Sequence, residues 1–168
     1  TTTPGAVYAS DSRFGAAIRA AFADDATVIL GSGALDGRTV RRFDDLLRTV
    51  PGAGVHAAHD ATRPDTIVKF LFTSGSTGNP KGVINTQRML CSNQEMIRTV
   101  MAFLADEPPT LCCWLPWNHT AGGNHNFGIV LYNGGTFYID EGKPTPGLFD
   151  VTLRNLREIS PSVYFNVP

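Results

Sequence analysis

The stretch TIVKFLFTSGSTGNPKGVIN, residues 66–85, decides how this chain folds. Its first eight residues are mostly β-branched or aromatic, which predicts a strand. The glycines of the loop that follows permit positive φ and let successive backbone N–H groups converge on an anion. The loop hydroxyls add donors, and Lys81 adds a positive charge that strengthens such hydrogen bonds. The stretch therefore predicts a phosphate-binding loop, with residues 82–85 able to pair back on the first strand.

This loop differs from the Walker A motif of P-loop nucleotide hydrolases. That motif needs a Gly-Lys-Ser/Thr sequence that opens a helix, whereas Lys81 here follows Pro80 and precedes a short apolar run that predicts a strand. Clusters of Ser, Thr, Gly and Pro usually mark simple loops. The lysine and the preceding strand favour phosphate binding over that interpretation, and the missing Walker sequence disfavours a P-loop hydrolase.

The rest of the chain alternates short apolar runs with amphipathic segments. This alternation predicts an α/β fold with a layered, largely parallel sheet flanked by helices. The expected strands are 27–30, 66–73, 111–115, 136–139 and 162–167. The expected helices begin after a Ser12 cap, cover 40–47, follow a Thr86 cap with a buried Met and Leu stripe, and cover 121–131 and 149–159.

The domain organisation is predicted to be simple. Residues 1–168 are expected to form a single truncated α/β fragment, because the chain stops directly after a predicted strand. The segment 51–64 is rich in Gly, Ala, His and Asp and is expected to be an internal connecting loop. Its His56 and His59 have helical spacing but no third ligand beyond Asp60, so no protein-held metal is predicted.

The composition limits the possible partners. Hydrophobic residues make up 42% of the chain and charged residues 17%, which indicates a globular protein. The net charge of −1 gives no field that would attract nucleic acid or an anionic membrane, so neither is expected as a partner. The three cysteines lack metal-binding spacing and are expected to be reduced thiols, and no signal peptide is evident, so a cytoplasmic location is expected.

Two segments resemble a known family. TSGSTGNPKG, residues 73–82, resembles the signature loop of adenylate-forming enzymes: acyl-CoA synthetases, luciferases and the adenylation domains of peptide synthetases. WLPWNH, residues 114–119, resembles the family's strand that ends in Leu-Pro before a His or aromatic residue. The wider sequence, VINTQRMLCSNQEM (83–96) and LPWNHTAGGNHNFGIVLYNGGTFYID (115–140), is most similar to feruloyl-CoA synthetases.

The resemblance implies a subdomain of the family's large N-terminal domain and a two-step reaction. A small-molecule carboxylic acid would attack the α-phosphorus of Mg²⁺-bound ATP, and coenzyme A would then take the acyl group from the adenylate. Lys81 and His119 would be the catalytic residues, with His119 beside the acyl pocket. The phosphate-binding residues would be Thr73, Ser74, Gly75, Ser76, Thr77, Gly78 and Lys81.

Two departures from the family pattern leave the details of the pocket open. Gln87 follows Thr86 where the family often has histidine, and Asn118 replaces a more usual aromatic residue before His119. The family's downstream acidic and ribose-binding segments and its C-terminal domain are not in this sequence, so the chain alone is expected to be inactive. His125 also has a simpler interpretation, as a buried group hydrogen-bonded within the core.

Three hypotheses about function stay open at this point. The first is an acid–CoA ligase (AMP-forming) acting on an aromatic, ferulate-like acid, as in phenylpropanoid degradation. The second is an adenylating enzyme that passes the acyl group to a carrier-protein thiol. The third, from a different class, is a non-catalytic phosphate- or nucleotide-binding module. The sequence does not indicate an oligomeric state.

Overall fold

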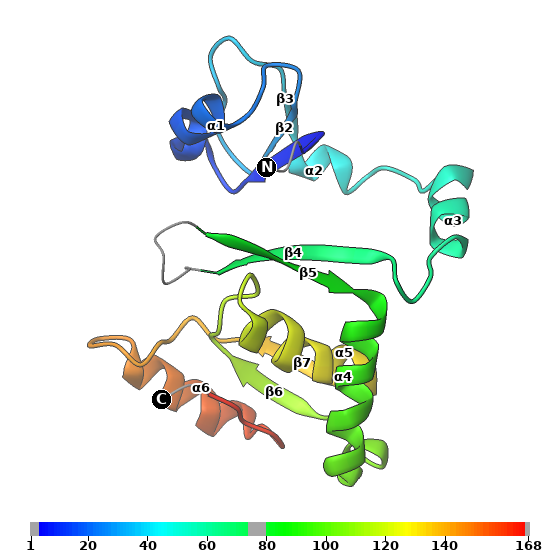
Figure 1. Ribbon diagram of the computed structural model, residues 1–168. Coiled ribbons are helices and arrows are strands. Elements are labelled where there is room, and N and C mark those ends of the chain that lie inside the picture. Colours follow the sequence, from blue (N-terminus) through cyan, green and yellow to red (C-terminus); the bar gives the residue numbers. More distant parts are fainter. Residues whose placement is uncertain (1–3, 74–79, 167–168) are drawn as a thin grey trace. The chain divides into compact units, whose positions relative to one another are not determined.

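The computed structural model describes residues 4–73 and 80–166. The chain divides into two compact units, Thr1–Ala61 and Thr62–Pro168, whose elements are labelled in Figure 1. The boundary between the units lies within the segment 51–64 that the sequence marks as a connector.

The first unit contains a three-stranded parallel sheet in the order β1-β2-β3. Its strands are β1 (Ala6–Ala9), β2 (Thr27–Leu30) and β3 (Val40–Arg42). A 3₁₀ turn, η1 (Ser12–Phe14), leads into helix α1 (Gly15–Ala21), and α2 (Phe43–Leu46) and α3 (Ala53–Asp60) follow the sheet. In the core of this unit, Ile18 of α1 packs against Val28 and Leu30 of β2 and against Leu35 of the following loop.

Three expectations for the first unit need correction. The first helical turn is capped by Asp11, which accepts a hydrogen bond from the backbone nitrogen of Arg13, rather than by Ser12. The segment 40–47 begins as a strand, β3, because Val40 pairs with Val28 of the sheet before the chain turns helical. The connector 51–64 is not a loop throughout, since its alanines and histidines form α3.

The second unit begins with an antiparallel hairpin of β4 (Ile67–Thr73) and β5 (Lys81–Thr86). The ladder is regular from Thr73↔Lys81 to Lys69↔Asn85 and is shifted by a bulge between Ile67 and Lys69. The sequence prediction that the segment after the loop pairs back on the first strand is therefore confirmed.

Helix α4 (Gln87–Val100) follows the hairpin and is capped as predicted, with the Thr86 hydroxyl accepting from the backbone nitrogen of Met89. The expected burial of the Met and Leu stripe is confirmed only at its C-terminal end, where Leu104 is buried and Ile97 and Met101 pack against the core cluster. Met89 and Met96 are more than half exposed, and the buried residue of this helix is Gln94. The 3₁₀ turn η2 (Ala102–Ala105) ends the segment.

A second parallel pair, β6 (Thr110–Cys113) and β7 (Thr136–Ile139), forms the centre of this unit. The chain leaves β6 into the π-helix η3 (Thr120–Asn126), which continues as α5 (Phe127–Asn133), while α6 (Phe149–Ile159) packs against β6. Figure 1 shows α5 and α6 with the β6–β7 pair between them. The core cluster consists of Leu104, Leu111, Ile129, Val130 and Val163.

The predicted fold class is confirmed: the chain is α/β, with parallel sheets flanked by helices. The strand expected over 162–167 is not formed between Ser162 and Asn166. This segment makes only two hydrogen bonds to the start of β6, through the Ser162 hydroxyl and the Val163 backbone nitrogen to Thr110. Within the described part of the chain, no helix is both long and apolar enough to cross a membrane.

Candidate functional site

The glycine-rich loop connects the two strands of the β4–β5 hairpin. Thr73 and Lys81 are paired partners in the ladder and both are exposed, so a hydroxyl and a cation stand where the loop leaves and re-enters the sheet. A strand starts at Lys81, as the sequence predicts, because Pro80 and the β-branched residues after Lys81 favour extended backbone. Ser74, Gly75, Ser76, Thr77 and Gly78 lie outside the described residues.

His119 lies at the start of the π-helix η3. It is the N-cap residue, and its Nδ1 accepts a hydrogen bond from the backbone nitrogen of Ala121 at 3.2 Å. Since an imidazole nitrogen that accepts a hydrogen bond carries no proton, neutral His119 holds its proton on Nε2. The exposed ring therefore presents an N–H donor to a ligand, which suits a carboxylate or a phosphate oxygen.

Two glycines let the π-helix fold back on the loop that precedes it. A side chain at Gly122 would overlap the carbonyl oxygen of Pro116, and one at Gly123 would overlap that of Trp117. Trp117 is itself fixed by rings of α5 and β7, at 4.9 Å from Phe127 and 5.8 Å from Phe137. This packing fixes the backbone on both sides of His119.

His125 lies one turn further along the same helix and is both hydrogen-bonded and accessible. Its Nδ1 is 2.8 Å from Oδ1 of Asn126, and its ring meets Phe165 edge to face at 4.7 Å. Asn126 is 1% exposed and donates from Nδ2 to the Cys113 sulfur and to the Phe165 carbonyl oxygen. Since that nitrogen is the donor, Oδ1 accepts, and Nδ1 of His125 carries a proton.

The two histidines line an open groove of about 470 Å³ at the carboxyl end of β6. Its wall is mostly apolar and its floor includes Asn126. The lining residues are Leu115, His119, Thr120, Ala121, His125, Asn126, Phe165 and Asn166. In parallel α/β sheets ligands bind beyond the carboxyl ends of strands, so this is the expected position for a substrate.

Sequence reasoning found His119 but missed Phe165 and Asn166, which lie some forty residues further along the chain. It also left His125 as a core group, whereas the structure places it in the groove wall. No local spacing in the sequence indicates this groove, because Phe165 and Asn166 reach the two histidines only through the fold.

Asp140 directly follows β7 and is 5% exposed, so its carboxylate acts on neighbouring buried groups. Its Oδ1 accepts from the Gly142 backbone nitrogen and from Asn155 Nδ2, both at 2.8 Å. Burial raises the pKa of the Cys112 thiol to about 11, and the Asp140 charge adds to this increase. Burial and Asp140 also raise the pKa of Tyr164. Both groups therefore stay protonated at neutral pH.

No group of three or more His, Cys, Asp or Glu side chains that could hold a metal exists among residues 4–73 and 80–166. Lys81 and Thr73 are exposed at the end of the hairpin, and the groove of His119 lies in the same unit.

Curated relatives match parts of this chain. A medium-chain-fatty-acid–[acyl-carrier-protein] ligase of Teredinibacter turnerae is 42% identical over 74 residues, covering 44% of this chain and 11% of the relative. A long-chain-fatty-acid–CoA ligase of Gallus gallus is 26% identical over 130 residues, covering 76% of this chain and 17% of the relative. The matched segments therefore cover less than a fifth of the length of either relative.

Solved structures share the fold. ATP-bound MatB from Rhodopseudomonas palustris superposes with a TM-score of 0.61 at 23% identity, over 96% of this chain and 29% of that one. An anthranilate CoA ligase in complex with anthranoyl-AMP gives a TM-score of 0.68 at 16% identity, over 96% and 30%. The family described as AMP-binding enzyme matches residues 10–168. This chain belongs to the AMP-binding enzyme family.

Proposed function

We propose that the protein carrying this chain is an ATP-dependent acid ligase that forms an acyl-adenylate and then an acyl-CoA thioester. The observation that supports this most directly is the Thr73↔Lys81 pair at the mouth of the glycine-rich loop. A hydroxyl donor and an ammonium group at the two ends of a loop rich in backbone N–H groups fit the β- and γ-phosphates of ATP. The match to the AMP-binding family supports the same assignment.

In this mechanism the chain's residues position the reactants and stabilise charge. Lys81 and Thr73, with Ser74, Gly75, Ser76, Thr77 and Gly78, hold the departing pyrophosphate as negative charge builds on its oxygens. His119 donates from Nε2 to the carboxylate or to an α-phosphate oxygen. Mg²⁺, held through the phosphates and a loop hydroxyl, would neutralise part of the phosphate charge.

The groove beside His119 is proposed to take the acid. In its wall, the rings of His125 and Phe165 pack edge to face with their centroids 4.7 Å apart. Such aromatic surfaces suit a flat aromatic acid of the ferulate type. The sequence resemblance to feruloyl-CoA synthetases supports this choice. Packing of the acid between rigid side chains would hold its carboxylate for attack on the α-phosphorus, and such positioning contributes substantially to the rate of a reaction between two bound groups.

A second candidate differs in the thiol acceptor. The relative from Teredinibacter turnerae is named as a ligase that acts on an acyl-carrier protein, and it shares 42% identity over 74 residues with this chain. The corresponding product would be an acyl group on a carrier-protein thiol. Supplying the protein with ATP and acid, and then with either coenzyme A or a carrier protein bearing its phosphopantetheine thiol, distinguishes the two by the thioester that forms.

The experiment that tests the proposal is acid-dependent ATP–pyrophosphate exchange in the whole protein carrying this chain. Lys81→Ala should lower kcat/KM by a transition-state loss of about 3 kcal/mol, the scale expected for one preorganised charged donor. Lys143→Ala is a matched control, because Lys143 is an exposed lysine outside the hairpin. If the whole protein shows no acid-dependent exchange, the proposal is contradicted and a non-catalytic phosphate-binding module is favoured. Exchange that Lys81→Ala leaves unchanged would remove Lys81 from its assigned role.

A further inference from the structure

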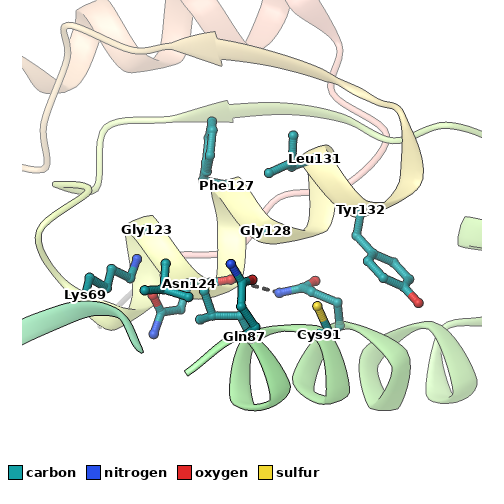
Figure 2. Close-up of a pocket in the computed structure, with 12 residues that line it drawn as sticks. Lys69, Gln87, Cys91, Gly123, Asn124, Phe127, Gly128, Leu131 and Tyr132 are labelled. Carbon is teal, nitrogen blue, oxygen red and sulfur yellow. Dashed lines mark hydrogen bonds between the residues drawn. The ribbon is translucent and has the colours of Figure 1, made fainter. Parts of the chain in front are cut away.

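Three carboxamide side chains from three elements of the second unit meet at one point. Asn124 of η3 donates from Nδ2 to Oδ1 of Asn85 in β5 at 2.8 Å. Gln94 of α4 donates from Nε2 to the backbone oxygen of Asn124, also at 2.8 Å. Asn85 is held in turn by its own bond to the Val83 carbonyl oxygen. We call Asn85, Gln94 and Asn124 the amide junction; Figure 2 shows Asn124 and the neighbouring turn of η3 facing α4.

Two of the three junction residues are buried although polar groups are costly to bury. Gln94 is 5% exposed and Asn85 is 7% exposed, while Met89 and Met96 of the same helix face solvent. A buried amide without partners costs free energy, whereas a partnered one fixes distance and direction between its elements. An apolar contact at this place would stabilise the packing but would hold the three elements less precisely.

The elements joined here carry the two halves of the proposed site. Asn85 follows Lys81 by four residues on one strand, with Val83 between them and no bulge in that part of the ladder. Side chains two apart in a strand leave the same face, so Lys81, Val83 and Asn85 share one face of β5. Asn124 follows His119 by five residues and lies in the π-helix that His119 caps. One hydrogen bond therefore links the strand of Lys81 with the helix of His119.

Gly128 makes this arrangement sensitive to one methyl group. It lies one turn beyond Asn124, and a side chain there would overlap Nε2 of Gln94, the atom that donates to the Asn124 carbonyl. Because Gly128 has no Cβ, the Gln94 amide can lie against the backbone of α5 and reach the Asn124 carbonyl oxygen of the π-helix. Because the overlapping atom ends a flexible side chain, an added methyl group would move the amide rather than the backbone.

We propose that the amide junction is a positioning device: Asn85, Gln94 and Asn124 set the separation between the phosphate-binding hairpin and the His119 helix for the adenylation step. This rests on the proposed function, in which the hairpin holds the ATP phosphates and the helix holds the acid. None of the three residues contacts a reactant in this proposal. Their role is to keep the carboxylate in line with the α-phosphorus, where a displacement of about 1 Å can slow a reaction by two orders of magnitude.

The first test replaces the hydrogen-bonding pair with isosteric apolar residues in the whole protein. Asn85→Leu and Asn124→Leu should each lower the single-turnover rate of adenylate formation, counted per active site, by about tenfold or more. The KM values for ATP and for the acid should change little, because each half of the site is intact. The double variant should be no slower than the slower single variant, since both changes break the same bond.

The second test uses a variant that keeps the fold. Gly128→Ala suits the interior of α5 by helix propensity but displaces the Gln94 amide, so it should slow adenylation as Gln94→Ala does. The combined variant Gln94→Ala with Gly128→Ala should be no slower than Gln94→Ala alone, because no amide remains to displace. Asn133→Ala is the matched control: its amide bonds only to Ile129 within the same helix in the described structure, and it should leave the rate unchanged.

The outcomes separate this inference from the proposed function. If the unaltered protein shows no acid-dependent exchange, the proposed function fails and the junction has no reaction to position. If the unaltered protein is active and the junction variants lose only thermal stability or the active fraction, with an unchanged rate per active site, the junction is merely structural and the inference is wrong. A lower rate per site with unchanged KM values, absent in Asn133→Ala, supports it.

Discussion

Asn126→Ala tests how the π-helix is anchored to the sheet. The side chain is 1% exposed, and it bonds to the Cys113 sulfur, the Phe165 carbonyl oxygen and Nδ1 of His125 at 2.8 to 3.3 Å. A typical hydrogen bond contributes about 1 kcal/mol net, and a buried group left without a partner costs about 1–3 kcal/mol. The truncation also leaves a small cavity. We expect the free energy of unfolding of the second unit to fall by about 3–4 kcal/mol.

Tryptophan fluorescence is a suitable assay because Trp114 and Trp117 are the two tryptophans of the chain and both lie in the second unit. The urea midpoint should fall while the slope of the transition stays the same. Asn126→Asp is an informative companion, because it keeps an acceptor for His125 but turns a carboxylate oxygen toward the Phe165 carbonyl. If Asn126→Ala changes the unfolding free energy by less than about 0.5 kcal/mol, as a surface substitution would, then these hydrogen bonds do not anchor the helix.

Three further predictions concern α4 and the cysteines. Thr86→Ala removes the cap of α4 and should cost about 1 kcal/mol of stability in the same urea assay, while Thr86→Ser should cost much less. A thiol reagent should modify Cys91 alone in the folded chain and all three cysteines in denaturant, because Cys112 and Cys113 are buried. Folding raises the pKa of Cys112 from 9.0 to about 11. Its contribution to stability is therefore complete below pH 9.0 and is lost as the pH rises through about 11, so the urea midpoint of the wild type should fall on alkaline titration more than that of Cys112→Ala.

The sequence predicted the elements whose signals are local. The hairpin around the glycine-rich loop, the Thr86 cap and the strand 136–139 follow from β-branched runs, a hydroxyl before an amphipathic segment, and a Gly-Gly turn. The α/β class followed from their alternation. These features depend on residues within a few positions of one another, and tertiary contacts did not override them.

The features that the sequence could not predict depend on contacts between distant segments. Helical spacing placed Met89 and Met96 in the core, yet the packing of α4 against α5 buries Gln94 instead. A hydrogen bond to the Asn124 backbone compensates the buried amide. The sequence predicts a strand over 162–167, but only Ser162 and Val163, at the start of that segment, form hydrogen bonds with Thr110. In the groove, His119 was found by its local motif, whereas Phe165 joins it only through the fold.

The bulge at the far end of the β4–β5 hairpin has a consequence for the length of the glycine-rich loop. In a regular two-stranded ribbon, one strand can shift along the other by two residues and keep the same side chains on each face. The irregular pairing between Ile67 and Lys69 breaks that equivalence, so a slipped ladder would misplace the bulge and lose hydrogen bonds. The irregular pairing therefore holds the ladder in one register, with Thr73 opposite Lys81. A fixed register keeps the number of unpaired residues between the two strands constant.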